Sequence, residues 1–201
     1  SPGDAPTSFT FNGASCGGSG VTPPASSVAN ITPSSSSAPS SAPVSNNAPS
    51  WVLDATGSSL TFVTVKKSAV GAETPEHMSF TQMRGTVSGS GQAVLTVPLD
   101  SITDGGNITR EGRMKSGLFE TSHLPNLHFS TQLNLADINT IPVGDTTVKA
   151  VTGTLILHGI SRSITFDAVI TKNTDRIVTV SPRKPIIIDS AHYDMSGGVA
   201  W

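Results

Sequence analysis

Between residues 59 and 188 apolar and polar side chains alternate, and this period of two restricts the chain to an all-β fold. In residues 59–65 and 92–99 an apolar side chain recurs at almost every second position, as expected for a strand with one buried face. The tetrapeptide Ser88-Gly89-Ser90-Gly91 has the composition of a hairpin loop. Comparable segments predict further strands at residues 80–87, 127–135, 148–158, 163–172 and 176–188.

One segment within this region, residues 107–119, predicts a short helix instead. It is polar, and its apolar residues are Met114 and the pair Leu118–Phe119. Many short strands separated by turn residues, together with one small helix, are typical of an antiparallel barrel or sandwich.

The composition changes sharply at Trp51, which we take as the start of the folded domain, residues 51–201. Residues 1–50 contain 14 Ser and 8 Pro, and Asp4 is their single charged residue. Such a segment lacks the apolar period needed to bury enough surface to offset its ordering entropy. We therefore expect an extended Ser/Pro-rich N-terminal segment before the domain.

Residues 7–12 are an exception within this segment. Phe9 and Phe11 share one face of a possible strand, and Asn12-Gly13 is a turn signal. The pair is either a chance occurrence in a disordered tail or a strand that docks onto a barrel.

Charge and composition exclude several classes of protein. Charged residues make up 13% of the chain and the net charge is −2, so the clustered basic face of a nucleic-acid-binding protein is not expected. No apolar run approaches the length of a membrane span. The abundant Ser, Thr and Gly fit a protein located outside the cytoplasm. The sequence begins at Ser1 without a basic, apolar leader, and we interpret it as a processed form.

No arrangement of residues predicts catalysis or a resident metal. His123 and His128 are the closest histidine pair, and their spacing matches no common metal motif. Glu73, Glu76 and His77 could bind a cation but are explained more simply as surface residues of a loop. We therefore predict a protein that is not an enzyme and has no cofactor.

The lone cysteine, Cys16, cannot form an internal disulfide. An inert thiol, an intermolecular disulfide and acylation within Ser15-Cys16-Gly17 all remain open.

The region around the predicted helix carries a recognisable order of residues: Arg110, Glu111, Met114, Ser116 and Phe119, followed by Leu124-Pro125 and Phe129. This order resembles the hallmark of the YceI-like family, which runs roughly R-D-x-H-L-x-S-x-x-F and is followed by Y-P-x-x-x-F. The chain departs from it at Glu111-Gly112-Arg113, where the acidic-imidazole pair is missing. A head-group contact made by that pair would have to be remade by Arg110, Glu111 or Arg113, or would be absent.

Two further elements extend the resemblance over residues 51 to about 195. Trp51-Val52-Leu53-Asp54 and Leu60-Thr61-Phe62 look like the opening strand of the family, and residues 153–160 look like its G-x-L-x-L-x-G element. The resemblance implies a lipocalin-like barrel that encloses a polyisoprenoid or another long-chain lipid. A barrel of about eight strands has room for side chains or one slender ligand.

The alternation then selects residues for the inner face, and the resemblance gives the helix the role of a lid. The expected ligand-binding residues are Phe62, Phe80, Met83, Leu95, Val97, Arg110, Met114, Leu118, Phe119, Phe129, Leu155, Leu157, Ile164 and Phe166.

Members of the family continue beyond the position of Tyr193-Asp194-Met195 into a strand that closes the barrel, whereas this chain stops at Trp201. Either sequence is missing or a strand from elsewhere fills the gap, since bare sheet edges are rare. The segment carrying Phe9 and Phe11 could fill it in its own barrel or in that of a neighbour. Two functions follow: an extracytoplasmic carrier of an isoprenoid-like lipid, or a subunit of an extracellular homopolymer built by strand donation.

Overall fold

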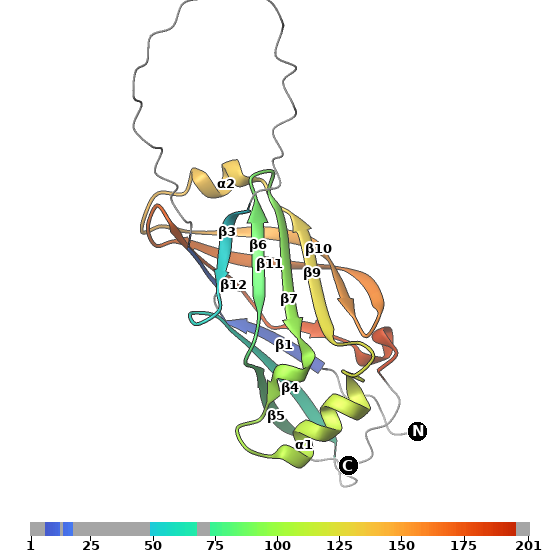
Figure 1. Cartoon of the computed structure of the whole chain (residues 1–201). Helices are drawn as coiled ribbons and strands as arrows, with labels where there is room; N and C mark the ends of the chain where they lie inside the picture. Colours follow the sequence, from blue (N-terminus) through green and yellow to red (C-terminus); the bar gives the residue numbers. More distant parts are fainter. Residues whose placement is uncertain (1–6, 13, 18–48, 68–72, 196–201) are drawn as a thin grey trace, which may run out of the picture.

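The computed structural model describes residues 7–12, 14–17, 49–67 and 73–195. Most of the strands close into one antiparallel barrel (Figure 1). In order around the barrel these are β10 (Thr146–Leu157), β11 (Ile160–Lys172), β12 (Ile177–Pro182), β2 (Ala14–Gly17), β3 (Pro49–Asp54), β6 (Arg84–Ser88), β7 (Gln92–Pro98) and β9 (Asn126–Gln132). The expected all-β, lipocalin-like antiparallel barrel is confirmed.

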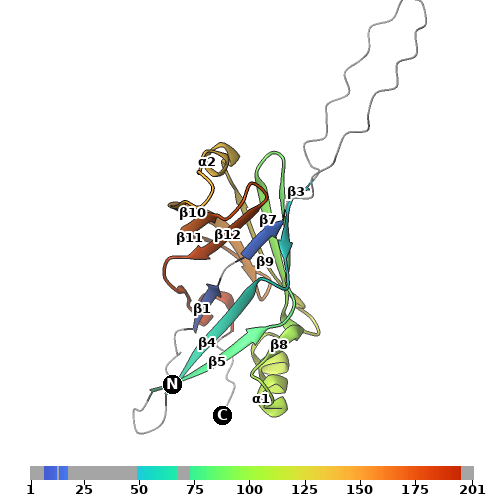
Figure 2. The same ribbon diagram turned by 90° about the vertical axis from the view of Figure 1, so that its left-hand side faces the viewer.

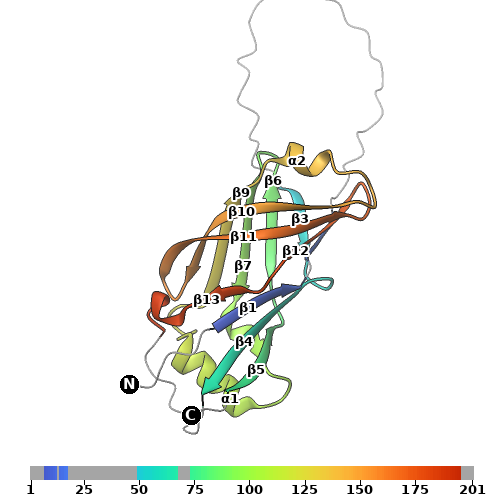
Figure 3. The ribbon, with the colours of Figure 1, turned by 180° about the vertical axis from the view of Figure 1, so that it is seen from behind.

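A second sheet leans across one side of the barrel. Its order is β13 (Ile186–Ile188), β1 (Thr7–Asn12), β4 (Ser59–Lys67), β5 (Glu73–Phe80) and β8 (Ile102–Thr103). Figure 3 shows β13 beside β1, followed by β4 and β5. The 3₁₀ turn Leu99–Ser101 leads from β7 into β8 and so connects the two sheets.

Two strands of the N-terminal segment take part in these sheets. Strand β1 lies antiparallel between β4 and β13, with Phe9 opposite Phe62 on one side and Ile186 on the other. Strand β2 lies between β3 and β12 and pairs Cys16 with Leu53 and Val178. Figure 2 shows these two N-terminal strands against the body of the chain. The side chains of Phe9 and Phe11 lie outside the described residues.

The predicted helix is present and short. α1 (Ile108–Arg113) begins at Asn107, whose side chain accepts a hydrogen bond from the backbone N–H of Arg110, the usual way to satisfy a free N–H at a helix start. It continues into a π-helical turn, Met114–Leu118. A second short helix, α2 (Leu135–Asn139), was not predicted, because an alternating pattern ran through residues 127–135. The side chain of Asn134 caps it by accepting the N–H of Ala136.

Two strand boundaries differ from the sequence prediction. Residues 80–87 are not one strand: β5 ends at Phe80 and β6 begins at Arg84. The remainder of β5 was read as a loop because it is polar and contains Pro75. Proline is tolerated there because β5 pairs along its length with β4 but over two residues only with β8, which leaves an edge.

Residues 176–188 are also interrupted, at Arg183–Lys184, where the chain leaves the barrel and enters the second sheet.

The hairpin of β10 and β11 is the longest in the described part of the chain. The two strands pair from Thr146 opposite Thr171 to Leu157 opposite Ile160, which leaves His158 and Gly159 as the turn. Both turn residues have positive φ, 51° and 73°, as a type I′ hairpin turn requires. Burial alternates along β10, so that one face of the hairpin forms the inner wall of the barrel.

Candidate lipid-binding cavity

An apolar cavity of about 220 Å³ lies inside the barrel. Its lining comes from most strands of the barrel, from β4 and β13 of the second sheet, and from α2. The lining residues are Leu53, Leu60, Gly85, Thr86, Val87, Ala93, Val94, Leu95, Leu127, Phe129, Thr131, Leu133, Ile138, Val151, Leu155, Ile164, Phe166, Ala168, Ile170, Val180, Pro182, Ile186 and Ile188. Because this lining is almost entirely hydrocarbon, water gains little by entering it and an apolar chain gains much.

Strand alternation positions this lining. Val151 and Leu155 on β10 and Ala168 and Ile170 on β11 all point inward, and all four are buried. The alternate residues Thr152, Thr154 and Ile156 of β10 are exposed, and the first two are polar. Residues 151–157 therefore give the wall one apolar face and one face toward water.

Phe129 and Phe166 meet within the cavity, with ring centroids 5.9 Å apart. Gly153, on the strand next to Phe129, makes room for this pair. A Cβ atom at Gly153 would lie 2.4 Å from Cζ of Phe129 and 2.6 Å from the carbonyl oxygen of Ser130. The absence of a side chain at residue 153 thus sets the position of the Phe129 ring.

The structure divides the apolar members of the predicted ligand-binding set into two groups. Those that line the cavity are Leu95, Phe129, Leu155, Ile164 and Phe166. Those that belong to the packed core and do not line the cavity are Phe62, Phe80, Met83, Val97, Met114, Leu118, Phe119 and Leu157. Their role in ligand binding stays a prediction.

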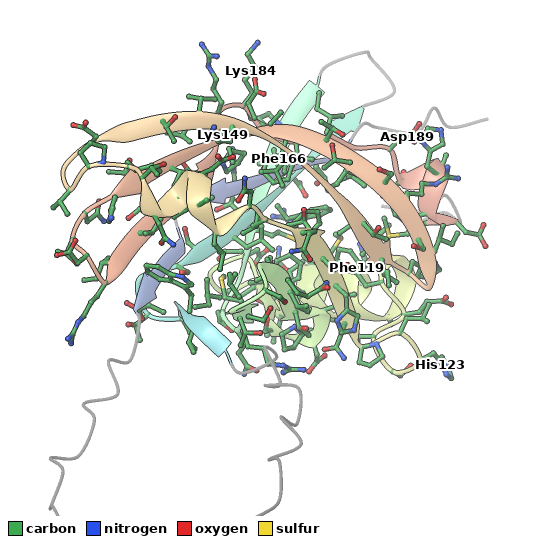
Figure 4. All side chains as sticks on the ribbon, turned by 90° about the horizontal axis from the view of Figure 1, so that it is seen from above. Phe119, His123, Lys149, Phe166, Lys184 and Asp189 are labelled. Atoms are coloured by element: carbon green, nitrogen blue, oxygen red, sulfur yellow. The ribbon has the colours of Figure 1, made fainter. Side chains whose placement is uncertain are left out.

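The packed group fills the end of the molecule next to α1. Phe119 contacts Phe62 and Phe80 edge-on, with centroids 5.6 and 6.1 Å apart, and Met114 is fully buried beside them. The residues expected to form a lid are therefore closely packed in the hydrophobic core at this end of the molecule. Figure 4 shows Phe119 and Phe166 well separated across the interior.

Arg110, the expected head-group residue, faces two carboxylates. Its Nη2 lies 3.2 Å from Oε1 of Glu76, and its Nη1 lies 3.3 Å from Oδ2 of Asp104. The second contact is an ion pair without the geometry of a hydrogen bond. Glu111 accepts hydrogen bonds from Thr103 Oγ1 and from the backbone N–H of Asp104. Arg110 and Glu111 thus fasten α1 to β5 and β8, and Arg110 is not among the cavity-lining residues.

Sequence reasoning missed other lining residues, among them Leu53, Ala93, Val151, Ala168 and Ile188. Four of the five fall in the strands predicted from alternation, and Leu53 falls in the opening strand that the family resemblance implied. Their alternation marks the face they occupy, but it does not mark how deep along the strand the cavity lies.

His158 uses both ring nitrogens to contact two other parts of the chain. Its Nε2 lies 2.9 Å from Oε2 of Glu120, and its Nδ1 lies 3.1 Å from the carbonyl oxygen of Tyr193. These contacts join the β10–β11 turn to the end of the α1 region and to the 3₁₀ turn Ser190–Tyr193. Burial raises the pKa of the neighbouring Tyr193 hydroxyl, against the opposing charge of Arg162.

Among residues 7–12, 14–17, 49–67 and 73–195, no group of three or more His, Cys, Asp or Glu side chains is placed to hold a metal ion. None of the helices within these ranges is long and apolar enough to cross a bilayer. At the end of β3, Thr56 donates hydrogen bonds through Oγ1 and its backbone N–H to Asp54, and these lower the pKa of that carboxyl.

Comparison with known proteins agrees with this geometry. The chain is similar to the solved structure of a polyisoprenoid-binding domain from Saccharophagus degradans implicated in plant cell wall breakdown. The TM-score is 0.69 and the sequence identity 29%, over 75% of this chain and 83% of the other. No curated protein matches the chain. Residues 51–200 match the YceI-like domain, and the chain therefore belongs to the YceI-like family.

Proposed function

We propose that the chain binds one long isoprenoid-like lipid in the cavity of the barrel and acts as a carrier or store rather than as a catalyst. The observation that carries this proposal is the almost wholly apolar lining of the cavity. Its modest volume suits a slender chain rather than a bulky ring system. The similar domain from Saccharophagus degradans is described as polyisoprenoid-binding, which supports the same ligand class here.

Lipid occupancy is tested by extracting protein purified from its native source with organic solvent and identifying what is released. Near-stoichiometric release of a long-chain amphiphile is expected. Native mass spectra that show only ligand-free protein from that source would contradict the proposal.

A filling substitution tests the position of the ligand. Ala168→Phe places a ring inside the cavity, because Ala168 is buried and lines it. Ala150→Phe is the matched control, because Ala150 lies on the paired strand β10 and is exposed. Lipid recovery should fall strongly in the first variant and stay unchanged in the second. An equal loss in both would show that the cavity is not the binding site.

We further propose that the protein acts outside the cytoplasm. The support is the low charge of the chain and its long Ser/Pro-rich segment. Cell fractionation in the native host tests this location, and recovery of the protein in the cytoplasm alone would contradict it.

As a second candidate, we propose a subunit of an extracellular homopolymer linked by N-terminal strands. The observation that favours it is that β1 and β2 precede the matched domain of residues 51–200, yet occupy sheet positions between its strands. In this structure both strands pair with strands of their own chain. Exchange of the same strands between copies would link one copy to the next. Strand addition of this kind supplies backbone hydrogen bonds as well as apolar contacts.

Deleting residues 1–17 tests the second candidate. The variant should be monomeric, it should expose four sheet edges, and a synthetic peptide covering residues 7–17 should bind it. Size measurement on the freshly purified full chain provides the control. A full chain that is strictly monomeric at all concentrations would rule the polymer out and leave the lipid proposal standing.

A further inference from the structure

We propose that the wall of the barrel opens sideways between β11 and the β12–β13 connection, and that Arg183 and Lys184 at this opening bind an anionic head group of the lipid. The inference rests on the proposed lipid-binding function. It adds the place where the ligand reaches solvent and the chemical class of its head group.

The hydrogen-bonded ladder beside β11 is interrupted at this place. Strand β11 pairs with β12 as far as Ala168, and the backbone N–H of Arg183 then donates to the carbonyl oxygen of Asp167 over 2.8 Å. At the far end, Nε of Arg162 donates to the carbonyl oxygen of His192 over 2.6 Å. Between these two contacts, residues 163–166 pair with β10 only, among the described residues. Four strand residues span about 13 Å.

The facing strand is also an edge. Strand β13 ends the order of its sheet and pairs with β1 alone. Figure 3 shows β11 on the side of β13 that is opposite β1. Two strand edges therefore face each other here without a ladder between them, although sheet edges in proteins are usually paired or covered.

A pocket of about 480 Å³ occupies this opening. Its lining comes from residues 164–167 on β11 and residues 183–187 on the other side. Ile164, Phe166 and Ile186 line both this pocket and the inner cavity. The pocket and the cavity therefore adjoin at these three side chains, and in this proposal the pocket is the vestibule through which an apolar chain in the cavity reaches solvent.

The charges around the vestibule favour an anion. The titratable groups in its lining are Arg183, Lys184 and Asp167, which gives two cations and one carboxylate. Arg183 and Lys184 are exposed, and neither has an ion-pair partner among the described residues. Figure 4 shows Lys184 projecting outward from the wall, with Phe166 on the inner side of it.

An anionic head group fits this arrangement because it places its charge in solvent at the cations while its chain stays in hydrocarbon. Arg and Lys form strong charge-assisted hydrogen bonds with phosphate and carboxylate oxygens. Ile187, 72% exposed beside them, adds apolar surface at the mouth. A neutral head group would leave both cations without a partner.

Binding of geranylgeranyl monophosphate and of geranylgeraniol to the delipidated full chain tests the inference, because the two probes differ only in the head group. Calorimetric titration at low salt should give a dissociation constant about tenfold lower for the monophosphate. The double variant Arg183→Gln/Lys184→Gln should lose this preference and keep its affinity for the alcohol. Arg84→Gln/Arg176→Gln, which removes two exposed cations outside the vestibule, should keep the preference.

Each other outcome overturns the inference in a different way. Equal affinities for both probes would remove the head-group role and leave lipid binding intact. Absence of binding by either probe would remove the proposed function as well. Inorganic phosphate that binds as tightly as the monophosphate would indicate a free-anion site. If Arg183→Gln/Lys184→Gln changes aggregation but not selectivity, the two residues protect a sheet edge and do not bind ligand.

Discussion

Gly153→Ala tests whether the packing around Phe129 shapes the cavity. The added Cβ would lie 2.4 and 2.5 Å from two ring carbons of Phe129 and 2.6 Å from the carbonyl oxygen of Ser130. The carbonyl belongs to β9, which is held in register by Gly153 opposite Thr131. The backbone therefore has little freedom to yield, and the ring must move toward the cavity.

The expected loss of stability follows from three contributions. Overpacking of a well-filled site costs about 1–3 kcal/mol, and disturbing the contact between Phe129 and Phe166 costs about 0.5–1.5 kcal/mol more. Replacing Gly by Ala restricts the unfolded chain and returns about 0.4–1 kcal/mol. The free energy of unfolding should therefore fall by roughly 0.5–4 kcal/mol, and lipid binding should weaken because the displaced ring fills the cavity.

Urea denaturation of the delipidated protein measures this change. The control is Gly112→Ala, because a Cβ at Gly112 meets no atom within 4 Å. Since Gly112 lies in α1, that variant should be neutral or more stable by up to about 1 kcal/mol. In a Phe129→Leu background the cost of Gly153→Ala should shrink, since the ring clash is gone. Costs that add independently in the double variant would refute this reasoning.

Three further outcomes are expected from the polar contacts. Burial raises the pKa of Tyr193 in the folded state. The neutral hydroxyl therefore contributes fully to stability below about pH 10, and this contribution is lost as the pH rises through the folded-state pKa. The melting temperature should fall less steeply with rising alkaline pH in Tyr193→Phe than in the unchanged protein. Arg110→Gln leaves the Asp104 side chain, which is 2% exposed, without its cation. The free energy of unfolding measured in urea should fall by about 1–3 kcal/mol. Adding Asp104→Asn should restore part of this loss. Glu120→Gln keeps a hydrogen-bond acceptor for His158 but removes the negative charge. Because Glu120 is half exposed, the free energy of unfolding should change by less than about 1 kcal/mol. A larger loss would show that this contact stabilises the fold more than an exposed ion pair normally does.

The sequence predicted the strands well where one face of each strand is buried. Residues 148–158 alternate clearly because β10 separates the barrel interior from water. The failure at β5 has the opposite cause: an edge strand with Pro75 and mostly polar residues carries no strong period. Helix α2 was missed for a related reason, since a single short turn of helix contributes too few residues to interrupt an alternating pattern.

The sequence predicted part of the candidate site. It did not predict how far along each strand the cavity extends. Leu155 and Leu157 share a strand and a face, yet Leu155 lines the cavity and Leu157 packs in the core toward α1. Alternation cannot separate them, because both obey the same period of two. The vestibule was equally hidden, since it arises where β12 and β13 diverge at Arg183–Lys184 and not from any motif.

Closure of the barrel by β2 has a consequence for biogenesis. Strand β2 is made long before its partner Val178 on β12, because most of the described chain lies between them. Contacts so distant in sequence form slowly, because the connecting chain must first be ordered at an entropic cost. During synthesis the barrel therefore stays an open sheet with exposed apolar surface until β12 has been made. For the first function proposed above, this interval is when a lipid can enter without passing the finished wall; for the second, it is when a strand of another copy can take the place of β2 between β3 and β12.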